Sequence, residues 1–488
     1  MKTRILPLFF LFAFLSCENL YDNSGKWSDY LGAENSFNDS YDEKYKDHGE
    51  NPFISTAEQA VSTFSVDADG GSYANARRYI NLGQLPPVAS VRIEEFINYF
   101  TFDYAEPQSG ENVALHSEVA TCPWNTEHHL IRVGMKGYTI PANELPNSNY
   151  VFLIDVSGSM SSPDKLGILK SGFKTLVDNL NDNDKVAIVT YAGSAAVLLQ
   201  STPCDEKSKI KNAIDKLGAG GSTAGAEGII TAYEIAEENF IPGGNNRVII
   251  GSDGDFNVGP SSTEELIELI EEKRETGIYL TVLGVGGGNL NDHMMEQIAN
   301  KGNGNYEYID NTKQLQKVFI HEVARLYTVA KDSKIQITFN PNTVESYRLI
   351  GYENRALEED DFEKDSVDAG EIGSSQTITA LYEVVLTDAS GTEAYAQFDF
   401  RYKKPEEAES RLLTHEIKMV PAAIEQSSEN MRFATAVTAF GLILKESEYK
   451  GTANGDMVLQ LAQGAKSFDP NEYRKDFIEL LNLNVWKE

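Results

Sequence analysis

Between residues 148 and 330, two kinds of segment alternate along the chain: continuous apolar runs, and segments with apolar residues at helical spacing. Short continuous apolar runs occupy residues 150–155, 186–191, 248–250 and 278–285. Runs of this kind are typical of parallel strands that are covered by helices on both faces. Several of the segments between them carry apolar residues every three or four positions, as amphipathic helices do. Strands that alternate with helices predict an α/β fold with a doubly wound, mostly parallel, Rossmann-like sheet over residues 148–330.

The regions on either side of this sheet have different patterns. Residues 51–147 combine a helical spacing at 92–100 with alternating stretches typical of strands, which predicts an α+β N-terminal domain. Residues 331–488 contain mainly alternating stretches before helical spacing returns, which predicts a β-sandwich-like domain with a helical tail. Residues 18–50 are rich in Asp, Asn, Ser and Tyr and have no apolar periodicity, so we expect a disordered acidic tether.

The first 17 residues have the pattern of an export signal. Lys2 and Arg4 precede an apolar run of roughly ten residues, which is too short to span a bilayer. Ser16 and Cys17 then resemble the lipobox of bacterial lipoproteins, in which the cysteine is lipidated; a plain signal peptide is the alternative. No later segment reaches membrane-spanning length, so the lipid would be the only anchor. We therefore expect a lipid-anchored protein of the bacterial cell envelope, with the outer membrane favoured.

Charge and cysteine content exclude several classes of function. The 488 residues suffice for several domains. With 74 acidic and 42 basic residues the formal charge is −32, which repels phosphate backbones and argues against nucleic-acid binding. Apart from Cys17 the chain has only Cys122 and Cys204, which are too few for a cysteine-rich zinc site. Whether these two form a disulfide stays open, because the sequence does not give their Cα separation.

Polar segments follow two of the buried runs, and a glycine-rich loop lies between them in the sequence. Together they offer two carboxylates and three hydroxyls: Asp155, Ser157, Ser159, Thr223 and Asp253. Ligands of doubly wound folds bind at the carboxyl ends of the strands, so we expect these five side chains to meet there. The alternative is a helix capped by serine beside ordinary turn acids.

Oxygen donors without histidine or thiolate select Mg²⁺, Mn²⁺ or Ca²⁺ over zinc. Mg²⁺ suits the set best, because it keeps bound water and needs six ligands in near-octahedral geometry. Five side chains leave room for water and for one external oxygen. An external carboxylate, such as that of an Asp or a Glu of a partner, can complete the coordination of the bound cation.

At these residues the sequence resembles a known family. Residues 151–160, Gly220 to Thr223 and Ser252 to Gly254 resemble the three loops of the von Willebrand factor type A domain. The resemblance implies a metal ion-dependent adhesion site in which the serines and the threonine bind the cation directly. The two aspartates would act directly or through water. All five positions are present.

The resemblance extends beyond the type A domain. Motifs at residues 62–67, 85–87, 122–125, 253–257 and 347–354 are similar to those of exported bacterial proteins in which characteristic domains flank the type A domain on both sides. This implies cation-dependent protein binding by a chain whose flanking domains surround the site.

Other metal motifs are weaker. Asp253, Asp255, Asn257 and Glu264 have the spacing of an EF-hand, but Val258 stands where the sharp turn needs glycine. Asp255 and Asn257 are better interpreted as supports of the predicted metal loop. Asp67 and Asp69, beside two glycines, could also ligate a cation, although an ordinary turn is favoured.

Two enzyme motifs are also set aside. The glycines at 284 and 286 follow a strand, but Asn289 replaces the third glycine of a dinucleotide-binding loop. His128 and His129 lie on a predicted strand, where neighbours face opposite ways, and no nucleophile accompanies them.

The sequence favours a non-enzymatic adhesion or envelope-assembly protein. Two alternatives remain. One is a structural envelope protein whose metal only holds loops together. The other is a metal-dependent hydrolase, for which Asp255 is the only base that the metal loops supply.

Overall fold

The structure, a computed structural model, describes residues 43–67, 69–221, 225–254, 263–388, 393–418 and 420–486. These residues belong to one compact unit, Tyr41–Glu488. Within them, no helix combines the length and the apolar character needed to cross a membrane.

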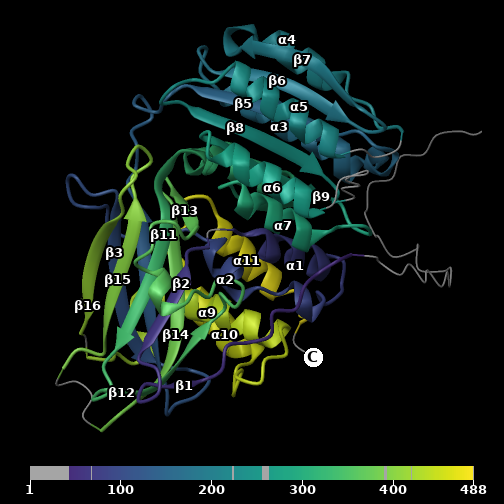
Figure 1. Cartoon of the computed structure of the whole chain (residues 1–488). Helices are drawn as coiled ribbons and strands as arrows, with labels where there is room; N and C mark the ends of the chain where they lie inside the picture. Colours follow the sequence, from purple (N-terminus) through teal and green to yellow (C-terminus); the bar gives the residue numbers. More distant parts are fainter. Residues whose placement is uncertain are drawn as a thin grey trace, which may run out of the picture. The chain divides into compact units, whose positions relative to one another are not determined.

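A six-stranded sheet forms the centre of the predicted α/β domain (Figure 1). In spatial order its strands are β10 (Tyr306–Ile309), β9 (Ile278–Val285), β8 (Asn245–Ser252), β5 (Ser148–Asp155), β6 (Lys185–Tyr191) and β7 (Ala195–Pro203). All neighbours pair in parallel except β7, which runs antiparallel to β6 at the edge. The predicted doubly wound, mostly parallel sheet is confirmed.

Helices cover both faces of this sheet because its strands are apolar on both sides. The helices are α3 (Ile168–Asn179), α4 (Lys207–Asp215) and α8 (Thr312–Gln316) on one side and α5 (Gly225–Glu238), α6 (Thr263–Arg274) and α7 (Asp292–Lys301) on the other. In β5, Tyr150, Phe152 and Ile154 pack with the first group. Val151 and Leu153 pack with the second group. Burial of alternate residues on opposite faces explains the uninterrupted apolar run.

The flanking regions form two antiparallel sheets packed around a common core. The first has the order β1 (Ile54–Ser55), β12 (Val344–Ile350), β14 (Thr377–Leu386), β4 (His129–Gly137) and β3 (Val113–Thr121). The second contains β13 (Gly370–Gly373), β11 (Thr328–Phe339), β15 (Ala396–Lys403) and β16 (Arg411–Ile417), and β2 (Val61–Ser65) pairs with β11. The sequence suggested separate N-terminal and C-terminal domains, but their strands share both sheets.

The helical tail likewise packs against the N-terminal region. Its helices α9 (Glu429–Leu444), α10 (Gly455–Gln463) and α11 (Tyr473–Leu481) share a core with α1 (Gly71–Asn81) and α2 (Ile93–Asn98). The ring centroids of Phe96 and Phe440 lie 6.0 Å apart, and those of Phe100 and Phe433 lie 4.9 Å apart. The first and last parts of the described chain therefore stabilise each other.

The disulfide left open by the sequence is not formed. Cys122 and Cys204 are free thiols in two different cores, the first among the flanking helices and the second in the α/β domain. Their sulfur atoms therefore cannot approach to bonding distance. Burial raises the pKa of both thiols, that of Cys204 to about 12, which also makes them poorly reactive.

The predicted tether at 18–50 ends earlier than expected. Glu43 forms an ion pair of 2.8 Å with Arg78 of α1 and accepts a hydrogen bond of 2.7 Å from the amide of Gly288. The amide of Lys44 donates to the carbonyl of Leu290 at 2.8 Å. Specific ion pairs and backbone hydrogen bonds thus order residues 43–50 despite their polar composition.

Candidate metal centre

The predicted metal residues lie where the strand order of the central sheet reverses. The chain proceeds from β5 outward to β6 and β7, and then returns to place β8 on the other side of β5. This topological switch point is where doubly wound folds bind ligands. Asp155 is the last residue of β5, and Asp253 directly follows β8.

The loop after β5 holds its side chains in a compact turn. The amide of Ser157 donates to Asp155 Oδ1 at 2.8 Å, and the hydroxyl of Ser252 donates to Asp155 Oδ2 at 3.1 Å. The hydroxyl oxygens of Ser157 and Ser159 are 3.0 Å apart. The side chain of Ser159 also hydrogen-bonds Asp253. The structure therefore brings four of the five predicted residues together.

The glycine-rich loop lies against this turn. The amide of Gly220 donates to the carbonyl of Val156 at 2.7 Å, and the amide of Gly158 donates to the carbonyl of Gly221 at 3.1 Å. Gly221 has a φ of +99°, a conformation that favours glycine. Thr223 follows two residues later and lies outside the described residues.

The predicted supporting residues Asp255 and Asn257 and the predicted lipidation residue Cys17 also lie outside the described residues. His129 begins β4 in a flanking sheet, and His128, which directly precedes this strand, contacts Glu383 at 2.6 Å. The structure therefore separates these histidines from the metal loops.

A lysine that the sequence analysis did not single out reaches the site. Lys165, in a π-helical turn (Pro163–Gly167), places its Nζ 2.9 Å from Asp253 Oδ2 and 3.0 Å from Asn289 Oδ1. Only 8% of Lys165 and 1% of Asp253 is exposed, so the ion pair is buried. The sequence gives little signal for this contact, because a lysine beside a helical pattern normally points to solvent.

The two aspartates differ in their electrostatic surroundings. Burial raises the pKa of Asp155, and the charge of Asp253 adds to the shift, while hydrogen bonds from Ser157 and Ser252 oppose it. Burial also acts on Asp253, but the hydrogen bond and the charge of Lys165 outweigh it and lower the pKa of that carboxyl. Asp253 thus has a cationic neighbour, whereas the hydrogen bonds given to Asp155 come from uncharged donors.

These observations fit a hard divalent cation. Two buried carboxylates close enough to influence each other are costly without a positive charge, and an ammonium group already lies against one of them. The described donors are carboxylate and hydroxyl oxygens, the ligands that Mg²⁺ and Ca²⁺ prefer. The cation would be held by Asp155, Ser157, Ser159 and Asp253, with Thr223 from the adjoining loop.

Models of three protein families match successive parts of the chain. The von Willebrand factor model matches residues 39–132, and the von Willebrand factor type A domain matches residues 149–321. The C-terminal region of the uncharacterized protein YfbK matches residues 324–485. The predicted resemblance to a type A domain flanked on both sides is confirmed.

Several individual proteins are similar to parts or to most of this chain. The uncharacterized protein YfbK of Escherichia coli (strain K12) is 41% identical over 467 residues, which cover 90% of this chain and 80% of that protein. A UPF0353 protein of Mycobacterium sp. (strain KMS) is 28% identical over 216 residues, which cover 39% of this chain and 64% of that protein. The solved von Willebrand factor type A structure from Catenulispora acidiphila has 15% identity and a TM-score of 0.44, covering 77% of this chain and 91% of that one. The chain thus belongs to the YfbK family and carries a von Willebrand factor type A domain, a protein-interaction module.

Proposed function

We propose that this protein binds partner proteins through a divalent cation held at the switch point of its type A domain. Asp155, Ser157, Ser159, Thr223 and Asp253 bind Mg²⁺, with Mn²⁺ or Ca²⁺ as substitutes, and an Asp or Glu of the partner completes the coordination. The protein acts as a non-enzymatic adhesion or envelope-assembly module.

The observation that carries this proposal is the pair of buried aspartates among hydroxyl groups. Lys165 neutralises one negative charge, which leaves Asp155 with hydrogen bonds from uncharged groups. Lys165 and a divalent cation together bring three positive charges to the two carboxylates, and the one positive charge in excess attracts a partner's carboxylate. A site with spare coordination positions is suited to capture an external ligand, which favours binding over a purely structural role.

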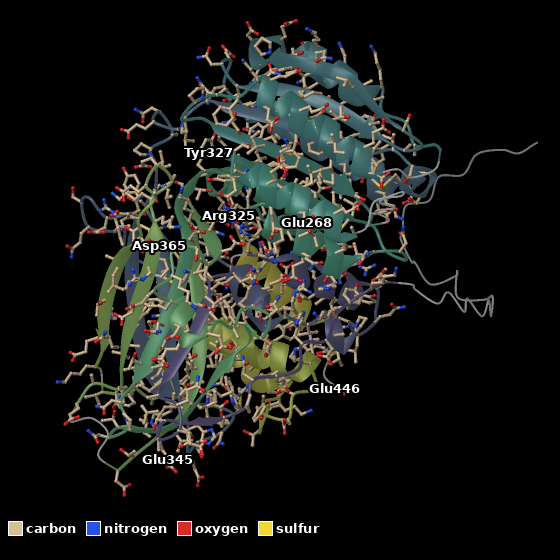
Figure 2. All side chains as sticks on the ribbon, in the orientation of Figure 1. Glu268, Arg325, Tyr327, Glu345, Asp365 and Glu446 are labelled. Atoms are coloured by element: carbon tan, nitrogen blue, oxygen red, sulfur yellow. The ribbon has the colours of Figure 1, made fainter. Side chains whose placement is uncertain are left out.

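The envelope anchor is part of the same proposal. Lipidation at Cys17 would attach the chain to a membrane by lipid alone, with the outer membrane favoured. The formal charge of −32 makes nucleic acid an unsuitable partner. Exposed acids lie on many segments; Figure 2 labels Glu268, Glu345, Asp365 and Glu446 as examples. Replacing Cys17 by Ser should move the protein from the membrane fraction to the soluble fraction; continued membrane association would refute the lipid anchor.

Magnesium binding and partner capture test the site together. Wild type and Asp155→Ala are titrated with Mg²⁺ in a calorimeter and then used to capture proteins from envelope extract, with and without chelator. Asp178→Ala is the matched control, because Asp178 lies exposed near the end of α3, the helix that follows the metal loop, in a surface ion pair with Lys211. We expect Asp155→Ala alone to lose Mg²⁺ binding and chelator-sensitive capture.

The outcomes separate the alternatives. If wild type takes up neither Mg²⁺ nor Mn²⁺, the proposed site is refuted. If Asp155→Ala lowers the melting temperature but still captures the same partner, the metal only holds loops together. Mg²⁺-dependent turnover of phosphoester or peptide substrates would support a hydrolase instead.

A further inference from the structure

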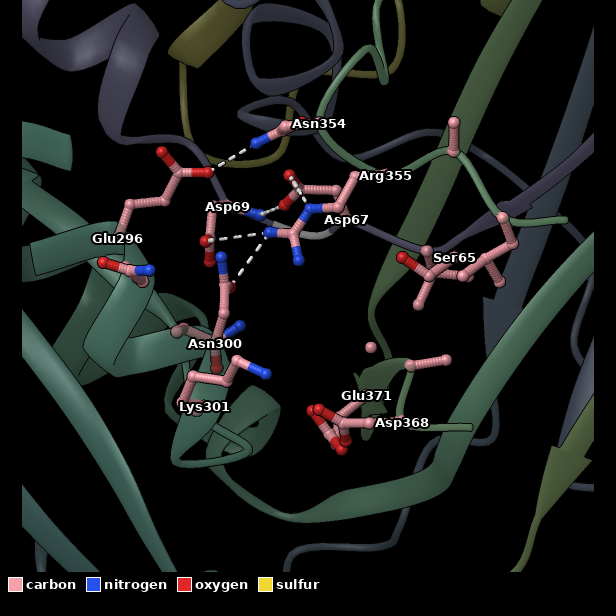
Figure 3. A pocket seen from close by; sticks show the side chains of 18 of the residues that line it. Ser65, Asp67, Asp69, Glu296, Asn300, Lys301, Asn354, Arg355, Asp368 and Glu371 are labelled. Carbon is pink, nitrogen blue, oxygen red and sulfur yellow. Dashed lines mark hydrogen bonds and ion pairs between the residues drawn. The ribbon is translucent and has the colours of Figure 1, made fainter. Parts of the chain in front are cut away.

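A second group of acids lies far from the metal loops in the sequence. Asp67 and Asp69 follow β2, and the amide of Asp69 donates to Asp67 Oδ1 at 3.0 Å in the turn before α1. The fold brings Glu95 of α2 and Glu296 of α7 to this turn (Figure 3 shows Asp67, Asp69 and Glu296). One carboxylate oxygen from each of Asp67, Glu95 and Glu296 lies within 4.8 Å of the others.

These carboxylates are almost completely buried. Asp67 is 3% exposed, Glu95 0% and Glu296 3%. They come from a turn, a helix of the flanking region and a helix of the type A domain, so the packing of the two regions creates the cluster. Three acids from three elements at this spacing match the way in which a protein surrounds a cation with oxygen ligands.

Arginines neutralise only part of this charge. Arg355 pairs with Asp67 at 2.9 Å and lies 4.0 Å from Asp69. Arg92 pairs with Glu95, with Asp292 at 2.6 Å and with Glu296 at 3.7 Å. Two guanidinium groups thus face the five carboxylates Asp67, Asp69, Glu95, Asp292 and Glu296, a difference of three negative charges. Buried negative charge of this size needs a further cation or bound protons.

A separate observation concerns Asp69, beside the cluster, whose Oδ2 atom has only a long contact of 4.0 Å with Arg355 in the ion pair described above. Asp69 is 2% exposed, and its Oδ2 atom makes no hydrogen bond within the described part of the chain. Asp67, Asp69 and Glu296 line a cavity of about 320 Å³. This cavity gives an ion a path to the cluster and space for coordinating water.

We propose that Asp67, Glu95 and Glu296 form a second cation site that binds Ca²⁺, with Asp69, whose Oδ2 atom lacks a hydrogen bond, beside the cluster. Ca²⁺ accepts six to eight oxygen ligands in flexible geometry and is commonly surrounded by several carboxylates. Mg²⁺ keeps more of its water and is rarely enclosed by protein ligands alone. The bound ion joins the β2–α1 turn and α2 to α7, and so fastens the type A domain to the flanking region.

Calcium titrations on the full chain test this site independently of the first. The Asp155→Ala background removes the proposed adhesion site, and we expect it to bind one Ca²⁺ and to melt at a higher temperature when Ca²⁺ is present. Adding Glu296→Gln, which keeps size and hydrogen-bonding groups, should weaken Ca²⁺ binding by at least about tenfold. The matched control is Glu371→Gln, because Glu371 lines the same cavity outside the three-carboxylate cluster. It should leave Ca²⁺ affinity unchanged.

Two results would overturn the proposal. The first is an Asp155→Ala protein that neither takes up Ca²⁺ nor melts differently with it, which would mean that protons balance the cluster. The second is loss of Ca²⁺ binding in Glu371→Gln but not in Glu296→Gln, which would place the ion elsewhere. If Glu296→Gln does not fold by circular dichroism, Asp69→Asn takes its place and is expected to weaken binding in the same way.

Discussion

Replacing Lys165 by Met should strengthen magnesium binding. The ammonium group lies 2.9 Å from Asp253 Oδ2, where it competes with a metal ion for the same carboxylate and repels the ion directly. Methionine keeps most of the side-chain length. The Lys165 side chain packs closely against Gly286, where an added Cβ would lie 2.4 Å from Lys165 Cε. A shorter side chain at position 165 would therefore leave a gap beside Gly286.

The magnitude follows from the burial of the pair. Two unit charges 4 Å apart interact by about 4 kcal/mol at an effective dielectric constant of about 20 and by about 1 kcal/mol in water. Exposed Gly158 and half-buried Ser159 lie beside the buried aspartates, so we take a value between these limits and expect a net gain of about 1.4 kcal/mol, a tenfold lower Kd for Mg²⁺. Without metal, loss of one partner of the buried pair should destabilise the protein by about 3 kcal/mol.

Calorimetric titration with Mg²⁺ measures the first effect, and melting curves with chelator or saturating Mg²⁺ measure the second. Lys174→Met is the control, because it removes the same charge from the surface of α3, where Lys174 pairs with Asp215. If Lys165→Met binds Mg²⁺ no more tightly than wild type while Lys174→Met behaves normally, Lys165 does not compete with the cation.

Three further predictions follow from other parts of the fold. The thiols of Cys122 and Cys204 should react with a thiol reagent only after denaturation, and reductant should not change the melting temperature; a shift on reduction would indicate a disulfide. Burial and the charge of Asp368 raise the pKa of Glu371 well above its usual 4.5, so its contribution to stability is present in acid and is lost as pH rises. In chelator, Glu371→Gln should therefore melt higher than wild type at neutral pH, with the difference shrinking toward pH 4.5; a constant difference would contradict the titration. Glu43→Gln removes one partner of a buried ion pair, so it should lower the free energy of unfolding, measured in urea, by about 3 kcal/mol. It should also expose residues 43–50 to proteases; unchanged proteolysis would mean that contacts other than this ion pair order the segment.

Local sequence patterns were sufficient for four of the six strands of the central sheet, β5, β6, β8 and β9. The apolar run before Asp155 and the runs in β8 and β9 coincide with strands because all three are buried on both faces. The edge strand β7 was missed, since most of its residues are polar or exposed and its alternation is weak. Its antiparallel direction follows from its pairing with β6 and leaves no local trace.

The sequence did not predict the contacts between distant segments. Ile131 pairs with Tyr382 in the flanking sheet, and nothing in either local pattern identifies the partner strand. Two of the three metal loops were recognisable because they follow strands of the α/β pattern, β5 and β8. Lys165 was not, because its role depends on a neighbour 88 residues away. The acids around Asp67 were visible only as a pair, and Glu296 joins them through tertiary packing alone.

The sharing of sheets between the two flanking regions has a consequence for biosynthesis. The hydroxyl oxygens of Ser148 and Tyr327, at the start and end of the type A domain, lie 2.9 Å apart. The chain therefore enters and leaves this domain at one place, and the two flanking regions form a single structural unit. The unit formed by the flanking regions lacks β12 and β14 until the last third of the chain emerges from the ribosome. An early nascent chain therefore presents β3 and β4 with an open edge that attracts wrong partners. Export in an unfolded state would postpone this risk until every strand is available.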